Sequence, residues 1–426
     1  MPATIDVGAE GRPRPGARET IAMLAGLMAL NAFAIDAMIP ALPAIGETLG
    51  VTQENDRQLV VVMYMVGFGS TQLLWGPLAD RFGRKPILAI GIALYAAFAL
   101  LCGLASSFAL LIVGRAAMGA SAAVTRVLVV AMVRDLFEGE AMARVMSLVF
   151  MTFMLVPVLA PSIGQLVLLV APWRAIFVVL AAYGLIMLAW SWFRLPETLH
   201  PDYRRSLAWR VMGEAAWATI REPQSRGYTL ALTALFGGLT AYIASIQQIT
   251  FDAFQAPDAI GLVFAAVAAP MALASWANAR LVGRFGLRRI GHFGALGFAI
   301  VTAFHAALAL AGGETLASFI AIQGLAMICF AFASSNLSTL AMEHMGPIAG
   351  SASSVQGVVT TIGGALIGLA IGQSFDGTAR PFLVGLAACA AAAFVTIVLT
   401  EPRRLFARIG PPPGKPPEPS LPEDIC

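Results

Sequence analysis

Charged side chains are scarce in this sequence. Only 12% of its 426 residues are Asp, Glu, Lys or Arg, whereas 58% are hydrophobic. A soluble globular domain carries about 25% charged residues, so this chain has too little polar surface to face water on all sides. The net charge of +3 is modest and does not indicate a nucleic-acid partner. The composition therefore excludes a soluble protein and predicts a membrane protein.

Cysteine and histidine are also rare. Cys102, Cys329 and Cys389 lie within apolar runs and Cys426 ends the chain, a spacing that matches neither a disulfide framework nor a zinc site. The four histidines are scattered, and only His305 lies clearly within an apolar run. An enzyme would need clustered nucleophiles, bases or metal ligands. We therefore expect no metal, no cofactor and no enzymatic activity.

Long apolar runs are what this sequence has in abundance. Runs of about 20 residues cross a bilayer core of roughly 30 Å, and spans of this length are helices because backbone groups in lipid must be paired within the segment. No small-residue cleavage site follows the first run, so we interpret it as a transmembrane helix and not as a signal peptide. The sequence predicts an all-α membrane protein with twelve transmembrane helices, at residues 21–41, 58–78, 86–105, 108–132, 146–170, 173–193, 228–250, 259–280, 291–311, 316–341, 350–373 and 381–400.

The positive charges are distributed unevenly between the two sides of this predicted bundle. Of the 27 Lys and Arg residues, only Arg57, Arg174 and Arg380 fall in the odd-numbered loops, and Arg115 and Arg126 lie within the fourth segment. Loops rich in Lys and Arg stay in the cytoplasm. The pattern predicts that both termini are cytoplasmic.

An internal repeat divides the chain into two halves. The triplet Arg-Phe-Gly follows the second segment at residues 81–83 and recurs after the eighth at 284–286. Such parallel repeats are typical of secondary transporters. We predict two pseudo-symmetric six-helix bundles, with an amphipathic surface helix in the linker and a proline-rich, disordered tail. The predicted parts are an N-terminal tail at 1–19, a bundle at 20–194, the linker at 195–226, a bundle at 227–402 and a C-terminal tail at 403–426.

One motif is especially specific. The sequence Gly-Pro-Leu-Ala-Asp-Arg-Phe-Gly-Arg-Lys-Pro begins at Gly76 and resembles the signature between helices 2 and 3 of the major facilitator superfamily. Gly83 permits a tight turn. By this resemblance, Asp80 faces the N-terminus of helix 11 and Arg84 pairs with Asp135. The resemblance implies a latch that holds the halves together on the cytoplasmic side when the transporter faces outward.

Four further stretches resemble the Bcr/CflA drug-resistance transporters within that superfamily. They are residues 35–43, 115–123, 156–165, and the pair 334–336 and 349–354. The resemblance implies a twelve-helix drug:proton antiporter of the bacterial inner membrane, with a small-molecule substrate, protons and the lipid bilayer as its partners, and we expect a monomer.

The predicted helix 5 departs from the pattern of this family. It carries Pro157, Pro161 and Gly164, but Gln165 stands where a second glycine usually follows. This departure weakens the case for antiport over symport.

Asp36 is the acidic residue that lies well inside a predicted span. A carboxylate in a membrane is costly and indicates function, and removal from water favours its protonated form, which suits a group that loads and releases a proton. A permanent pairing with a neighbour is the structural alternative. Arg115 lies at a similar depth in helix 4 and is predicted to assist proton coupling. Arg126 is as consistent with snorkelling or local pairing as with binding.

The predicted C-terminal half lacks such charges and carries neutral polar side chains. We expect it to contribute substrate contacts, together with Met and Tyr side chains that give an adaptable apolar wall. Each of these residues is also a candidate for a simple helix–helix contact. The candidates for the substrate cavity are Asn31, Tyr64, Met151, Met154, Tyr242, Gln247, Asn336 and Gln356. The alternative function is transport of a dedicated metabolite such as an amino acid, a sugar or a siderophore.

Overall fold

The computed structural model describes residues 16–137, 139–199 and 209–407, and within these ranges the protein is helical without strands. Eleven helices in the described ranges are long and apolar enough to cross a membrane. The twelfth long helix is α6, Gly139–Val170, whose part from Val156 to Val170 is strongly apolar. The predicted all-α membrane fold is confirmed.

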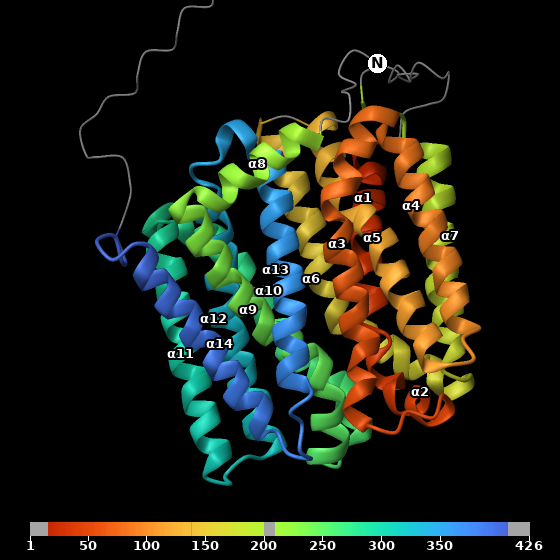
Figure 1. Ribbon diagram of the computed structural model, residues 1–426, viewed down its shortest axis with the longest axis vertical. Helices are drawn as coiled ribbons and strands as arrows, with labels where there is room; N and C mark the ends of the chain where they lie inside the picture. The colour runs from red at the N-terminus through yellow and green to blue at the C-terminus, as the bar shows by residue number, and fades with distance from the viewer. Residues whose placement is uncertain (1–15, 138, 200–208, 408–426) are drawn as a thin grey trace, which may run out of the picture.

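The long helices form two groups of six (Figure 1). The first group contains α1 (Ala17–Asp36), α3 (Leu59–Phe82), α4 (Arg84–Gly103), α5 (Phe108–Leu136), α6 (Gly139–Val170) and α7 (Arg174–Arg194). The second contains α9 (Pro223–Gln248), α10 (Ile260–Phe285), α11 (Leu287–Leu310), α12 (Leu316–Met342), α13 (Ala349–Gly372) and α14 (Arg380–Thr400). We call these groups the N-half and the C-half.

Short helices mark the two ends of the bundle. The tail face is the end where α1 begins and α14 ends, and α8 (Trp209–Arg221) lies across it (Figure 1). The loop face is the opposite end, where α2 (Leu42–Thr48) and the 3-10 helix η2 (Glu54–Gln58) lie. The side chain of Trp217 on α8 is 57% exposed. The helix therefore presents an aromatic side chain at the edge of the bundle, as an interfacial helix does.

The first helix ends earlier than the sequence predicted. We expected one helix over residues 21–41, but α1 ends at Asp36 and the chain continues into the 3-10 helix Ile39–Ala41. Pro40 and Pro43 lack the backbone N–H that a continuing α-helix needs. Asp36 consequently occupies the last position of α1, at a break in the helix.

The repeated Arg-Phe-Gly triplets make the same turn in both halves. Gly83 joins α3 to α4 with φ of 104°, and Gly286 joins α10 to α11 with φ of 86°. Glycine adopts positive φ without steric cost, which a residue with a Cβ does not. The sequence repeat therefore reflects a repeated backbone geometry.

Each half has its own apolar core. Among the described residues, buried side chains of the C-half form one cluster, which Ile39 joins, and those of the N-half form two. A small fourth cluster of Val62, Ala244 and Ala365 connects the halves. The halves meet where α3 contacts α13 and where α6 contacts α10. Figure 1 shows α13 beside α3, between the two groups of helices. The space enclosed between these contacts contains the candidate site.

Candidate functional site

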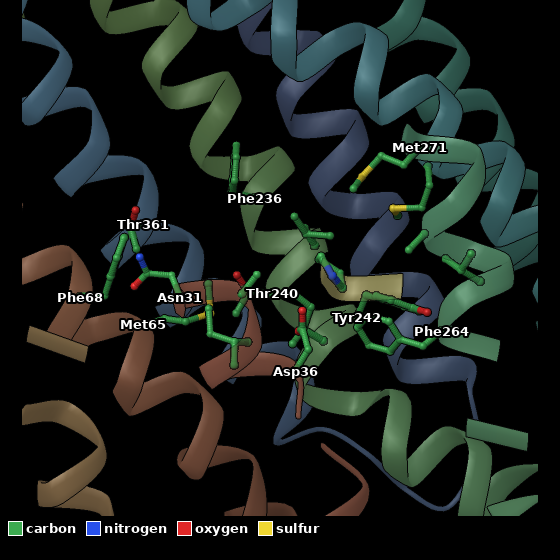
Figure 2. A pocket seen from close by; sticks show the side chains of 18 of the residues that line it. Asn31, Asp36, Met65, Phe68, Phe236, Thr240, Tyr242, Phe264, Met271 and Thr361 are labelled. Carbon is green, nitrogen blue, oxygen red and sulfur yellow. The ribbon is translucent and has the colours of Figure 1, made fainter. Parts of the chain in front are cut away.

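A cavity lies at the boundary between the two halves. It has a free volume of about 170 Å³ and is lined by side chains of α1, α3, α5 and α6 on one side and of α9, α10, α12 and α13 on the other. Most of its wall is apolar, including Phe68, Phe236, Phe264 and Met271 (Figure 2). Because both halves contribute to one apolar chamber, a small amphipathic molecule would contact both at once.

Asp36 supplies a carboxyl group to this cavity. Its side chain is 3% exposed, and its Oδ1 atom has no hydrogen-bond partner among the described residues. Within the described ranges, no lysine, arginine or histidine forms an ion pair with it. Figure 2 shows Asp36 beside Thr240 and Tyr242 of α9. The structural alternative, a permanently paired Asp36, therefore finds no support in these contacts.

Arg115 lies outside the cavity lining and holds three helices together. Its side chain is fully buried, its Nε donates to the Val60 carbonyl at 2.8 Å, and its Nη1 donates to the Ala34 carbonyl at 3.1 Å. The guanidinium also lies over the Tyr64 ring, 4.5 Å from its centre. Arg115 thus contacts the backbone of α1 two residues from Asp36 and forms no ion pair with it among the described contacts.

A hydrogen-bonded chain connects the cavity wall to this arginine. Asn31, which lines the cavity, donates to Thr125 Oγ1 at 2.7 Å and accepts from the Tyr64 hydroxyl at 3.1 Å. Tyr64 in turn stacks against Arg115. The chain joins α1, α3 and α5, and it fixes the position of Asn31 in the wall.

Arg126 lies on α5 and lines the cavity. Its neighbour Thr125 is fully buried, whereas the Arg126 side chain is exposed, although it lies in the middle of a membrane-spanning helix. Among the described residues, neither a hydrogen bond nor an ion pair engages its guanidinium. It therefore faces the cavity and does not pair locally.

The remaining cavity candidates separate into two groups. Asn31 and Tyr242 line the cavity, whereas Tyr64, Gln247, Asn336 and Gln356 are buried elsewhere.

Two of the buried amides connect helices of the C-half. Asn336 donates to Asn278 Oδ1 at 2.7 Å, and Gln356 donates to Ser225 Oγ at 2.8 Å. Met151 and Met154 belong to α6, but their side chains lie outside the described part of the structure.

The predicted helix 5 is α6, and the motif in it lies against α1 and the cavity. Pro157 lines the cavity, Pro161 is buried, and Gly164 lies so close to α1 that a Cβ would approach the Ala37 carbonyl oxygen to 2.2 Å. Only a glycine permits this approach. The motif thus sets the position of α1 next to the residue that carries the carboxyl group.

Gln165, which replaces the usual second glycine, reaches across to the C-half. Its Nε2 donates to the Pro257 carbonyl at 3.4 Å. On the opposing helix α10, a Cβ at Gly261 would lie 2.8 Å from Gln165 Oε1. The glycine that permits close contact at this point is therefore on the partner helix, and the glutamine fills the space.

Neutral amide side chains close the loop face. Gln58 donates to the Gly372 carbonyl at 3.0 Å and to Gln248 Oε1 at 2.5 Å. Asn55 accepts from Gln248 at 2.9 Å and donates to the Gln373 carbonyl at 3.0 Å. We call Asn55, Gln58, Gln248 and Gln373 the amide gate. The amide gate joins η2, at the start of α3, to the ends of α9 and α13.

The motif that begins at Gly76 forms an ion-pair cluster within the N-half. Arg84 Nη1 lies 2.7 Å from Asp80 Oδ1, and Arg84 Nε lies 3.3 Å from Asp135 Oδ2. A contact that we did not predict comes from Glu197, whose carboxylate accepts from the backbone N–H of Arg84 at 2.9 Å. This carboxylate occupies the N-terminus of α4, where the helix dipole favours negative charge.

The predicted helix 11 is α13, and Asp80 does not contact its N-terminus in this conformation. Its side chain is 38% exposed and its ion-pair partner is Arg84. At the start of α13, Gly350 is exposed, and a Cβ there would meet only open space. The contact expected between Asp80 and the start of α13 is therefore not formed.

A second ion-pair cluster, which the sequence did not reveal, lies at the tail face of the C-half. Arg288 contacts Glu343 at 2.5 Å and Glu401 at 2.7 Å. Burial alone raises the pKa of Glu401, but hydrogen bonds from Arg288 and Tyr228 outweigh it and hold the pKa below its usual value. Hydrogen bonds from Arg288 and Gln224 likewise lower the pKa of Glu343 against the effect of burial. The sequence feature that could have indicated this cluster is the position of Arg288, just after the repeated triplet.

Two solved structures share this architecture. A human organic anion transporter, TETRAN, superposes with a TM-score of 0.64 at 18% identity, over 91% of this chain and 99% of that one. A D-xylose–proton symporter superposes with a TM-score of 0.66 at 15% identity, over 88% of this chain and 96% of that one. At these identities the likeness shows the fold alone.

Sequence relatives are similar along nearly their whole length. A bicyclomycin resistance protein homolog of Haemophilus influenzae is 29% identical over 393 residues, which cover 90% of this chain and 96% of the relative. The multidrug resistance protein MdtL of Klebsiella pneumoniae is 29% identical over 389 residues, with 89% and 95% covered. These relatives confirm the resemblance to the Bcr/CflA transporters. The Major Facilitator Superfamily matches residues 24–368, and this chain belongs to that family.

Proposed function

We propose that this protein is a proton-coupled secondary transporter that exports small amphipathic or drug-like molecules by alternating access. The observation that carries the proposal is the Asp36 carboxyl group, which lines an apolar cavity shared by both halves and has no cationic partner among the described residues. A carboxyl group in such a place can exist in a neutral and a charged form. Its state therefore changes the polarity of the chamber that receives the substrate.

The names of the sequence relatives support export of drugs over import of a nutrient. The bicyclomycin resistance and multidrug resistance proteins match this chain across both halves. The cavity wall is consistent with that role, because aromatic and Met side chains accept varied apolar shapes and impose few directional contacts. Transport of a single dedicated metabolite remains the alternative that the experiment below distinguishes.

The arrangement of contacts supports an inward-facing state. By the distribution of Lys and Arg, we infer that the tail face is cytoplasmic and the loop face periplasmic. The amide gate closes the loop face, while the contact between Asp80 and the start of α13 is open. Proton binding at Asp36 and substrate release would then occur after the halves rock to open the loop face.

Transport into inverted membrane vesicles tests this function. Vesicles that pump protons inward should accumulate chloramphenicol-like compounds, sulfonamides or cationic and anionic dyes, and a protonophore should abolish the accumulation. Uptake of one metabolite only, such as an amino acid, would favour the alternative. Accumulation that is unaffected by the protonophore would contradict proton coupling.

A further inference from the structure

Arg126 differs from the other arginine within the same helix. Arg115 is fully buried and satisfies its guanidinium with the carbonyl oxygens of Val60 and Ala34 and the Tyr64 ring. Arg126 lines the central cavity, is exposed to it, and has no hydrogen-bond or ion-pair partner among the described residues. The two arginines therefore have different roles: one joins helices, and the other presents its charge to the chamber.

An unpaired guanidinium at this depth needs an explanation. Ionisable groups within membrane-spanning segments are costly, and they face a cavity where they serve a transported species. A structural arginine would pair with a carboxylate or with backbone carbonyl groups. Since Arg126 does neither, its five N–H donors are available to a molecule that enters the cavity.

The surrounding groups define the charge pattern of the chamber. Asp36 and Arg126 are its acidic and basic side chains, and most of the other lining groups are apolar. Arg126 follows Thr125, which accepts a hydrogen bond from Asn31. Asn31 precedes Asp36 by five residues of α1, so the hydrogen bond beside Arg126 lies about 7.5 Å from Asp36 along the axis of that helix.

We propose that Arg126 is the anchor for an anionic group of the substrate. The transported molecules are amphipathic compounds with a carboxylate or an equivalent planar anion, which a guanidinium binds through two parallel hydrogen bonds. Their apolar part lies against Phe236, Phe264 and Met271. This assignment rests on the proposed function, because it names the substrate class of the same cavity.

The charge preference is measured by ligand binding to the purified full-length protein. The probes are naproxen, its methyl ester and the corresponding primary amine, which share one aromatic body and differ in charge. Naproxen should raise the thermal unfolding midpoint of the protein. It should bind at least about tenfold more tightly than the ester, because it forms a charge-assisted hydrogen bond. The amine should bind more weakly than the ester. Arg126→Gln should remove this preference, and Arg126→Lys should restore part of it.

A matched control separates the site from general surface charge. Arg134 lies on the same helix, is exposed and does not line the cavity, so Arg134→Gln should keep the preference for naproxen. Equal binding of the three probes to the wild-type protein, or an undiminished preference in Arg126→Gln, would overturn the assignment. Because the readout is binding, it does not depend on proton-driven export. If the wild-type protein exports neutral compounds and shows no preference for the anionic probe, this inference is overturned and the proposed function stands.

Discussion

Gln58 Nε2 donates a hydrogen bond to Gln248 Oε1 at 2.5 Å, across the boundary between the two halves. Both side chains are fully or almost fully buried. A neutral hydrogen bond of this kind contributes only about 0.5–1.5 kcal/mol, so a network of amides holds the loop face closed without a large barrier to opening. A buried ion pair would be harder to break, because each separated charge would need rehydration. The amide gate is therefore suited to repeated opening.

Loss of one amide should open the gate. We predict that Gln58→Ala raises the labelling of a single cysteine, Ala32→Cys, by a membrane-impermeant thiol reagent added from the periplasmic side. The four native cysteines are replaced in this background. The substitution removes two hydrogen bonds between the halves, and a change of about 1.4 kcal/mol alters the ratio of conformations tenfold.

The control for this measurement is Gln53→Ala, because Gln53 is exposed and close in sequence to the amide gate. It should leave labelling unchanged. Equal labelling of Gln58→Ala and the parent protein would show that the amides do not govern access from this side.

Removal of the titratable group in the cavity should uncouple transport. We predict that Asp36→Asn inserts and folds but no longer accumulates substrate against its gradient in energised inverted vesicles. The amide keeps the shape of the side chain and cannot exchange a proton. Asp258→Asn, at an exposed position on the loop face, should transport normally. Accumulation by Asp36→Asn at the wild-type level would disprove the coupling role.

Arg115→Lys should reduce both stability and turnover. An ammonium group cannot reproduce the two directed hydrogen bonds to Val60 and Ala34 together with the contact to the Tyr64 ring. The loss of one charged hydrogen bond should lower the free energy of unfolding by about 1.5–3 kcal/mol. Thermal unfolding in detergent measures the first effect and vesicle uptake the second. An unchanged unfolding midpoint would mean that these contacts contribute nothing to stability.

The cluster around Arg288 should make the stability of the C-half sensitive to acid. Glu343 and Glu401 have lowered pKa values in the folded protein, so their contribution is present above the ordinary value of 4.5 and is lost as the pH falls through the folded values. The thermal unfolding midpoint should therefore decrease when the pH is lowered below about 4.5. In the double variant Glu343→Gln with Glu401→Gln, the midpoint at pH 7 should be lower and its dependence on pH smaller.

The same measurement contains its own check. If the double variant loses stability on acidification as steeply as the wild-type protein, other carboxylates determine the acid response. Glu54, whose side chain is 64% exposed and which contacts Arg57 at the loop face, provides a control substitution, Glu54→Gln, that should not alter the profile.

Length, hydropathy and charge were sufficient to determine the architecture from the sequence. Runs of apolar residues must become helices in lipid because each segment has to satisfy its own backbone hydrogen bonds. The Arg-Phe-Gly triplets identified the two halves, and the structure gives both the same glycine turn. Asp36 could be singled out for the same reason, since a carboxyl group within an apolar run is costly wherever the helix is placed.

The role of each polar side chain was decided only by tertiary structure. Arg115 and Arg126 share one helix and one residue type, yet the first binds backbone carbonyls of α1 and α3 and the second faces the cavity. Tyr64 and Gln247, which the sequence offered as cavity residues, are buried away from it. A membrane-spanning sequence is apolar on all sides, so it contains no amphipathic pattern that tells an inward face from a helix contact. The direction of a side chain then depends on how closely neighbouring helices approach, which only the assembled bundle determines.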